Sequence, residues 1–291
     1  MSRVTALLSK LDRIQPADPG FPRPDVRAQN PADPDEMTSV AKALGVLDSF
    51  RGRSESLGVT EVAAANGLPK STAFRLLAHL EASGLLERDG RKYRPSWQVF
   101  ELAQSSVLGR LDGPRSQALP LMTDLHALTR GVVHFGVRRG TEVMIAEKIF
   151  GTGSVDVPTY TGARLPLTTT SLGKALLVGE LRATGRMSLP PRPSRSTRHS
   201  VVAPGLLRDR IERAAARGFA VDREETVLGV SCVGVPVLRG TRPVGALSVA
   251  TRSIDFDEQR LARLIAHHAG VLSAALAADS DPPADRRAGS E

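Results

Sequence analysis

The sequence contains very little cysteine. Its 291 residues include one, Cys232, which excludes an internal disulfide and a zinc site built from several cysteines. A chain without disulfides is typical of a reducing compartment. No apolar run approaches the roughly 18 residues that a membrane span needs, and the N-terminus lacks the pattern of a cleavable signal peptide. These absences predict a soluble, cytoplasmic protein with no membrane partner.

Acidic residues are in deficit as well. The formal charge is +8, with 39 lysines and arginines against 31 acidic residues, which favours a polyanionic partner. Part of the excess lies in residues 182–198, which contain five arginines and no acid. Charge alone therefore supports nucleic-acid binding only weakly. Whether the chain binds nucleic acid has to be argued from a local motif.

Residues 57–81 provide such a motif, because they predict two short helices joined by a tight turn. They read LGVTEVAAANGLPKSTAFRLLAHLE. Thr60 is expected to cap the first helix, and Gly67 supplies the left-handed backbone that the turn needs. Pro69 suits the first position of the second helix. A further helix over residues 37–50 should precede the pair, capped by Thr38 or Ser39, and its apolar side is expected to face inward. That side consists of Val40, Ala43, Leu44 and Leu47.

The second helix of the pair has two unequal faces. Ala73, Leu76, Leu77 and Leu80 fall at helical spacing and predict a buried stripe. The opposite face gathers side chains that bind phosphate or read base edges. They are Lys70, Ser71, Thr72, Arg75 and His79. This combination is typical of a recognition helix in the major groove of DNA.

A basic hairpin is predicted directly after that helix. Residues 84–94 form two short strands around a turn at Asp89 and Gly90, a strong hairpin signal. Such a wing meets the phosphate backbone or an adjacent minor groove. Its cations are Arg88, Arg91, Lys92 and Arg94. An ordinary helical pair with a solvated hairpin stays open as the alternative.

The remaining chain alternates helices and strands. Helices are expected over residues 119–129, 173–182, 205–218 and 256–277, and strands over 131–138, 142–149, 227–238 and 244–250. Strands in hairpins with helices against them predict an α+β domain with a central antiparallel sheet. We expect a flexible proline-rich extension over 1–36, a winged helix-turn-helix domain over 37–96, a linker helix over 97–112, an effector domain over 113–278 and a flexible tail over 279–291.

Five short motifs follow one another along the chain: GLPKST at 67–72, GARLPL at 162–167, SLGKALL at 171–177, RGFAVDREE at 217–225 and GVSCVGVP at 229–236. Their order resembles the IclR family of bacterial transcriptional regulators over roughly residues 39–277. The resemblance implies a winged N-terminal domain, a GAF-like C-terminal domain that binds a small effector, and a homodimer or homotetramer.

The family's pockets, by similarity, place eight residues of this chain around an effector. They are Ser171, Leu172, Asp222, Cys232 and Ser248, with Val157, Leu165 and Val230 as apolar wall. Residues 168–171 form a hydroxyl run before a helix whose first N–H groups lack internal partners, which suits a carboxylate; helix capping by one hydroxyl is the simpler interpretation. Leu172 and Ala250 depart from the family pattern and predict a smaller, less polar pocket. A small organic acid or aromatic catabolite is the expected effector.

Two other classes of function stay open. One is a winged-helix architectural or RNA-binding protein that senses no effector. The other is an enzyme with Cys232 as nucleophile, although this thiol lies in an apolar strand pattern, where thiols are usually inert. The sequence shows no metal-ligand spacing and no cofactor motif. We therefore predict a repressor or activator, not an enzyme, whose paired recognition helices bind an inverted-repeat operator in double-stranded DNA.

Overall fold

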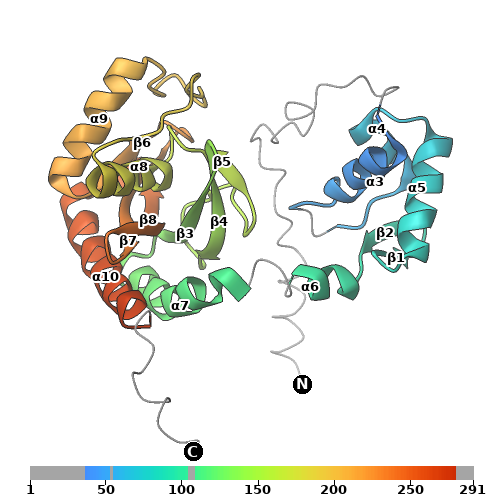
Figure 1. Cartoon of the computed structure of the whole chain (residues 1–291), viewed down its shortest axis with the longest axis horizontal. Helices are drawn as coiled ribbons and strands as arrows, with labels where there is room; N and C mark the ends of the chain where they lie inside the picture. The colour runs from blue at the N-terminus through green and yellow to red at the C-terminus, as the bar shows by residue number, and fades with distance from the viewer. Residues whose placement is uncertain (1–36, 53–54, 104–108, 280–291) are drawn as a thin grey trace, which may run out of the picture.

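The computed structural model of the chain describes residues 37–52, 55–103 and 109–279. The predicted extension over 1–36, and the predicted tail beyond residue 279, lie outside them. Two groups of elements are present (Figure 1), and each has its own hydrophobic core. The sequence prediction of a helical N-terminal part and an α+β C-terminal part is confirmed.

The N-terminal group is a helix-turn-helix followed by a hairpin. It comprises α3 (Ser39–Asp48), α4 (Val59–Asn66), α5 (Lys70–Ala82), β1 (Leu86–Asp89) and β2 (Lys92–Pro95). Their apolar sides share one core, which includes Val46, Val62, Leu77, Leu86 and Tyr93. Leu57 and Tyr93 also exchange two backbone hydrogen bonds of 2.9 Å, which tie the segment before α4 to the hairpin.

The helix ends differ in part from the prediction. Thr38 caps α3 as expected, and Gly67 adopts the left-handed conformation with φ 64°. Thr60, however, lies inside α4, because Gly58 is the N-cap and its N–H donates to the Glu61 carboxylate at 2.8 Å. Pro69 precedes α5 as its N-cap and not as its first residue.

The prediction for the apolar side of α3 is wrong in two of its positions. Val40 and Leu44 are 69% and 62% exposed, whereas Val46 and Phe50 are buried. Among the described elements α4 and α5 pack on α3, and they cover the side that carries Val46. A surface helix with apolar residues on two sides cannot reveal from sequence which side its neighbours cover.

The C-terminal group is built on a six-stranded antiparallel sheet in the order β5-β4-β3-β8-β7-β6. The strands are β3 (Val132–Arg139), β4 (Glu142–Ile149), β5 (Arg164–Pro166), β6 (Ala220–Arg223), β7 (Val230–Arg239) and β8 (Arg242–Arg252). Helices α8 (Ser171–Thr184) and α9 (Pro204–Arg217) lie on one side, and α7 (Gly109–Thr129) and α10 (Glu258–Ala278) on the other, with the short helix η2 (Ser253–Asp255) before α10 (Figure 1).

The structure does not have one continuous helix over the predicted linker at 97–112. α6 (Trp97–Ala103) ends before residues 104–108, which lie outside the described part, and residues 109–112 already belong to α7. A helix was expected here only from residue 119, although α7 begins at Gly109 and contains Pro114 and Pro120, each of which removes an intrahelical hydrogen bond. It persists through both prolines because Met122 and Leu125 are fully buried against the sheet.

Helix α10 corrects the expectation that no segment has the length and apolarity of a membrane span. Among the described helices it alone meets both criteria, with a mean hydropathy of 1.4. Leu261, Ile265, Leu272 and Leu276 are nevertheless buried in the core on the sheet. The apolar composition of α10 is therefore explained by its packing against the sheet inside the domain.

Candidate functional site

Helix α5 presents its polar face to solvent. Lys70, Ser71, Arg75 and His79 are exposed and Thr72 is half-buried, while Ala73 and Leu77 are fully buried on the opposite side. Within the described part of the chain, none of these five polar side chains makes a hydrogen bond or ion pair. Phe74 adds an apolar group, 48% exposed, that the sequence did not single out. The helix thus leaves donors and one aromatic ring available to an external partner.

The four cations of the hairpin are not equivalent. Arg88 contacts Glu81 at 3.2 Å and stacks on the Tyr93 ring at 4.6 Å. Lys92 approaches Glu61 at 3.6 Å, and Arg94 contacts Glu87 at 2.7 Å. Arg91, beside Gly90 in the turn, has no such partner among the residues that the structure describes. The hairpin therefore displays one unpaired guanidinium at its tip and three cations that neighbouring acids partly neutralise.

The second candidate site is a small cavity between the sheet and the start of α8. All eight residues predicted around an effector line it, although they come from six separate segments. Its volume is about 40 Å³, room for about three waters. Five further residues line it that were not predicted as contacts: His134, Ile145, Thr159, Thr226 and Val227. Thr170, from the hydroxyl run, and Ala250, whose departure from the family pattern predicted a smaller pocket, line it as well.

Polar side chains cross the floor of this cavity along neighbouring strands. Asp222 on β6 pairs in register with Cys232 on β7, and Ser248 on β8 pairs with His134 on β3. The imidazole Nε2 of His134 lies 2.7 Å from the Thr159 hydroxyl. Strand pairing thus aligns an acid, a thiol, a hydroxyl and an imidazole on one side of the sheet, where none of them is near the next in sequence.

The start of α8 closes the cavity. Thr170 caps the helix, since its hydroxyl accepts from the Gly173 N–H at 3.0 Å. The N–H groups of Ser171 and Leu172 precede the first intrahelical bond. Gly234 lets the strand approach this closely, because a Cβ there would stand 2.5 Å from the carbonyl oxygen of Ser171. The structure thus shows one threonine of the hydroxyl run as the cap of the helix, and the binding of a carboxylate at the remaining N–H groups stays a prediction.

Burial sets the charge states of the titratable side chains around the cavity. It raises the pKa of Asp222 to about 6, against the pull of the nearby Lys174 ammonium. It lowers the pKa of His134 to about 3, helped by Lys148, so the imidazole stays neutral near pH 7. Burial also raises the pKa of Cys232 well above its usual range, which keeps it a thiol and unsuited to nucleophilic attack.

A buried ion pair between Lys174 and Glu225 lies next to the cavity lining. The Lys174 ammonium lies 2.6 Å from the Glu225 carboxylate, and both side chains are 3% exposed. Arg210 reaches the same carboxylate oxygen at 3.1 Å. The Glu225 N–H donates to Asp222 at 2.7 Å. Lys174 and Arg210 are therefore paired with an acid, the Lys148 ammonium donates to the carbonyls of Val157 and Thr159, and the described residues that line the cavity include no lysine or arginine.

Comparison with known proteins identifies this architecture. The IclR helix-turn-helix family model matches residues 39–90, and the model of the bacterial transcriptional regulator IclR C-terminal domain matches residues 108–276. The chain belongs to the IclR family of bacterial transcriptional regulators. It contains the DNA-binding helix-turn-helix and the effector-binding C-terminal domain of IclR regulators.

Individual IclR proteins align over most of this chain. The Escherichia coli K12 regulator XynR is 30% identical over 237 residues, which cover 78% of this chain and 90% of XynR. The regulator KdgR of the same strain is 28% identical, over 80% of this chain and 89% of KdgR. The Thermotoga maritima IclR crystal structure has a TM-score of 0.66 at 26% identity, covering 82% and 98%. An IclR homolog of Microbacterium hydrocarbonoxydans, solved with 4-hydroxybenzoate, shares the fold with a TM-score of 0.71 at 24% identity, covering 83% and 100%.

Membership of the IclR family decides between the classes of function that the sequence left open. The related proteins are transcriptional regulators, so the chain is a DNA-binding regulator and not a Cys232-dependent enzyme. The unpredicted pocket residues have a simple origin. His134 lies on β3, and the sheet register brings it beside Ser248. Thr159 lies on a loop, where its hydroxyl contacts the His134 imidazole.

Proposed function

We propose that this IclR regulator binds an inverted-repeat operator through the α5 helices of two subunits. A small organic acid that binds in the cavity at α8 raises or lowers its affinity for that operator. The observation that carries the DNA part is the set of polar side chains on α5 that have no partner among the described residues, with Arg75 at its centre. Arginine forms bidentate bonds to guanine, and serine and threonine hydroxyls bond to several bases or to phosphate. The wing adds phosphate contacts, chiefly through Arg91. Such a protein acts in the cytoplasm, where its DNA lies.

The cavity favours a small effector with one carboxylate and an apolar body. The N–H groups at the start of α8 suit a carboxylate, and Val157, Leu165 and Val230 provide an apolar wall. Because the lining contains no free cation, Asp222 must be protonated or screened when an anion binds. The 4-hydroxybenzoate in the Microbacterium homolog has one carboxylate on an aromatic ring. It is larger than the roughly 40 Å³ of this cavity, so its binding requires the lining to move, and we take it as the first probe.

Exposed apolar side chains support a homodimer. Val40 and Leu44 on α3, and Trp97 and Phe100 on α6, are between 45% and 71% exposed, and the two aromatic rings stack at 4.7 Å. Large exposed apolar groups typically mark an interface, and two copies are needed to read two half-sites. Sedimentation equilibrium of Trp97→Ser and Val40→Ser should show more monomer than wild type. A wild-type monomer would contradict this interface, and a tetramer would require a second one.

Selection of operators from a randomised duplex pool tests the DNA-binding proposal. We expect enrichment of an inverted repeat whose half-sites are about one helical turn apart. The Arg75→Ala variant serves as control and should enrich little. Recovery of duplexes without a common sequence would instead favour the architectural alternative.

Cavity enlargement tests the effector proposal. Leu172 is 3% exposed, and its methyl groups fill the space opposite Gly136. Leu172→Ala should therefore bind 4-hydroxybenzoate more tightly, with Leu176→Ala, in the same core but outside the cavity lining, as control. Titration calorimetry with both variants measures the difference. If Leu172→Ala bound the probe no better than Leu176→Ala, the ligand would not occupy this cavity.

A further inference from the structure

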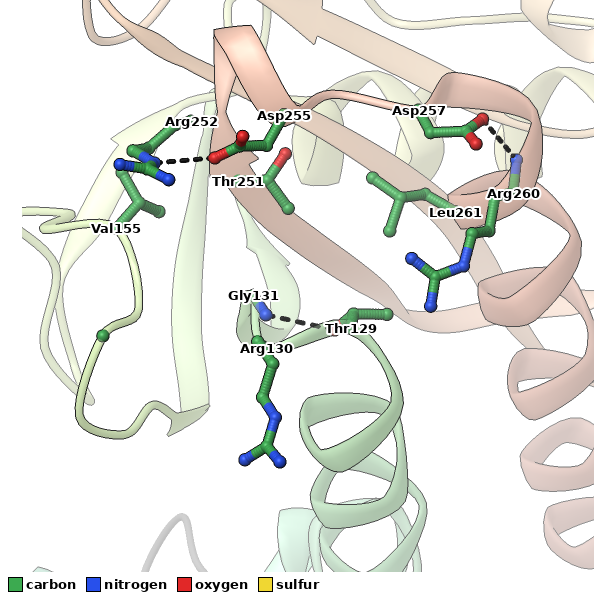
Figure 2. Close-up of a pocket in the computed structure, with 11 residues that line it drawn as sticks. Thr129, Arg130, Gly131, Val155, Thr251, Arg252, Asp255, Asp257, Arg260 and Leu261 are labelled. Atoms are coloured by element: carbon green, nitrogen blue, oxygen red, sulfur yellow. Dashed lines mark hydrogen bonds and ion pairs between the residues drawn. The ribbon is translucent and has the colours of Figure 1, made fainter.

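A second and larger cavity borders the first: Val155, which lines it, packs in one cluster with Val157, Val230 and Ala250 of the cavity at α8. Its volume is about 300 Å³, and it is bounded by the ends of α7 and β8, by η2 and by the start of α10. None of the residues that line it lines the cavity at α8. Figure 2 shows Arg130, Arg252 and Arg260 among the residues that line it, each on a different segment.

The acids of this cavity already have partners. Asp255 contacts Arg252 at 2.7 Å, and Asp257 accepts the backbone N–H of Arg260 at 3.0 Å as the cap of α10. The Arg260 guanidinium donates one bond, of 2.9 Å, to the carbonyl of Leu128 at the end of α7. Its other N–H groups have no partner within the described residues. The Thr251 hydroxyl is buried and likewise unpaired there.

Arg130 stands out because its backbone is left-handed, with φ 56°. This conformation is uncommon for a residue other than glycine, asparagine or aspartate, and such strain often accompanies a functional role. Its guanidinium makes no hydrogen bond or ion pair in the part of the chain that the structure describes. In Figure 2 the side chain points away from Thr251, so turning it toward a ligand would break no existing contact.

We propose that this cavity is a second ligand site, which binds a small polycarboxylate. Unpaired guanidinium and hydroxyl donors require acceptor oxygens, and arginine binds carboxylates in a bidentate manner. Arg130 and Arg260 both keep N–H groups without a partner among the described residues, so a molecule with two or three carboxylates can give each guanidinium a carboxylate of its own. The ligand would bridge the end of α7 and the start of α10.

Titration calorimetry of the full chain with citrate and succinate, at fixed ionic strength, tests this site. Arg130→Gly is an informative variant because glycine suits the left-handed backbone, so the fold should remain intact while the guanidinium is lost. We expect Arg130→Gly and Arg260→Gln each to weaken citrate binding about 10-fold or more. Succinamide, the uncharged analogue of succinate, should not bind.

Two controls separate this site from its surroundings. Arg263→Gln removes an exposed arginine of α10 that does not line the cavity, and Asp222→Asn alters only the cavity at α8; both should bind citrate as wild type does. Loss of binding in the two site variants alone supports the proposal. Equal affinity in all variants, binding of inorganic phosphate without either carboxylate, or no binding to wild type would overturn it.

Discussion

The surface of α5 and the cavity at α8 use polar side chains in opposite ways. On α5, Lys70 and Arg75 are exposed and unpaired within the described structure, so their charge is available to a polyanion. At the cavity, Lys174 is locked to Glu225 and Asp222 has a raised pKa. The difference teaches that a recognition surface keeps its charges hydrated and unpaired, whereas a buried site has to neutralise its own before a ligand arrives.

We expect the largest difference in stability between two variants that each lose one lysine, Lys174 beside the cavity or Lys70 on α5. Lys174→Met leaves Glu225 buried with only Arg210 beside it, and we expect a loss of about 3 kcal/mol in the free energy of unfolding. Lys70→Met should change it by less than about 0.5 kcal/mol. Urea denaturation measures both. Adding Glu225→Leu to Lys174→Met should restore most of the stability; no rescue would mean that the pair is not the source of the loss.

The pH dependence of stability tests the neutral state of the buried acid. The folded pKa of Asp222, about 6, exceeds the ordinary value of 3.8, so the native state binds this proton more tightly than the unfolded chain does. The proton on Asp222 therefore stabilises the native state fully below about pH 4, and this stabilisation is lost as the pH rises through 6. The free energy of unfolding should change by up to about 3 kcal/mol.

Asp222→Asn should therefore gain stability relative to wild type as the pH rises from 4.5 to 7.5. The exposed Asp209→Asn provides the matched control and should follow wild type throughout. Urea midpoints at four pH values measure the effect. Parallel curves for wild type and Asp222→Asn would show that the carboxyl is ionised across this range.

Arg75→Ala should separate DNA binding from stability. Loss of a bidentate base contact is expected to weaken specific binding by about 1 to 3 kcal/mol, while the melting temperature stays unchanged because the side chain is exposed and unpaired. Fluorescence anisotropy on the selected operator at fixed salt gives the affinity. An unaltered affinity would indicate that another face of α5 meets the bases.

The smallest expected effect compares two arginines of the wing. Arg91→Ala should reduce the slope of binding against salt concentration by about 1, as for one phosphate contact. Arg94→Ala should change it less, because Glu87 already neutralises that charge in part. Equal slopes for the two variants would show that DNA draws Arg94 away from its ion pair.

Sequence patterns predicted those features that depend on local order. The turn at Gly67, the recognition face of α5 and strand β4 follow from neighbouring residues, and the family resemblance supplied all eight expected lining residues of the cavity. The pattern did not indicate β5 or β6, which are three and four residues long. Nor did it indicate that His134 meets the cavity, because strand register brings it there. The exposure of Val40 depends on which helices pack nearby, which no single segment encodes.

Helix α7 has a mechanical consequence. Its 21 residues form a rod about 31 Å long, with one end buried on the sheet and the other five residues away from α6 along the chain. A tilt of about 3° at the buried end would shift the far end by about 1.6 Å, by simple leverage over that length. A molecule too small to span the domain could in this way displace a distant helix without unfolding anything between them.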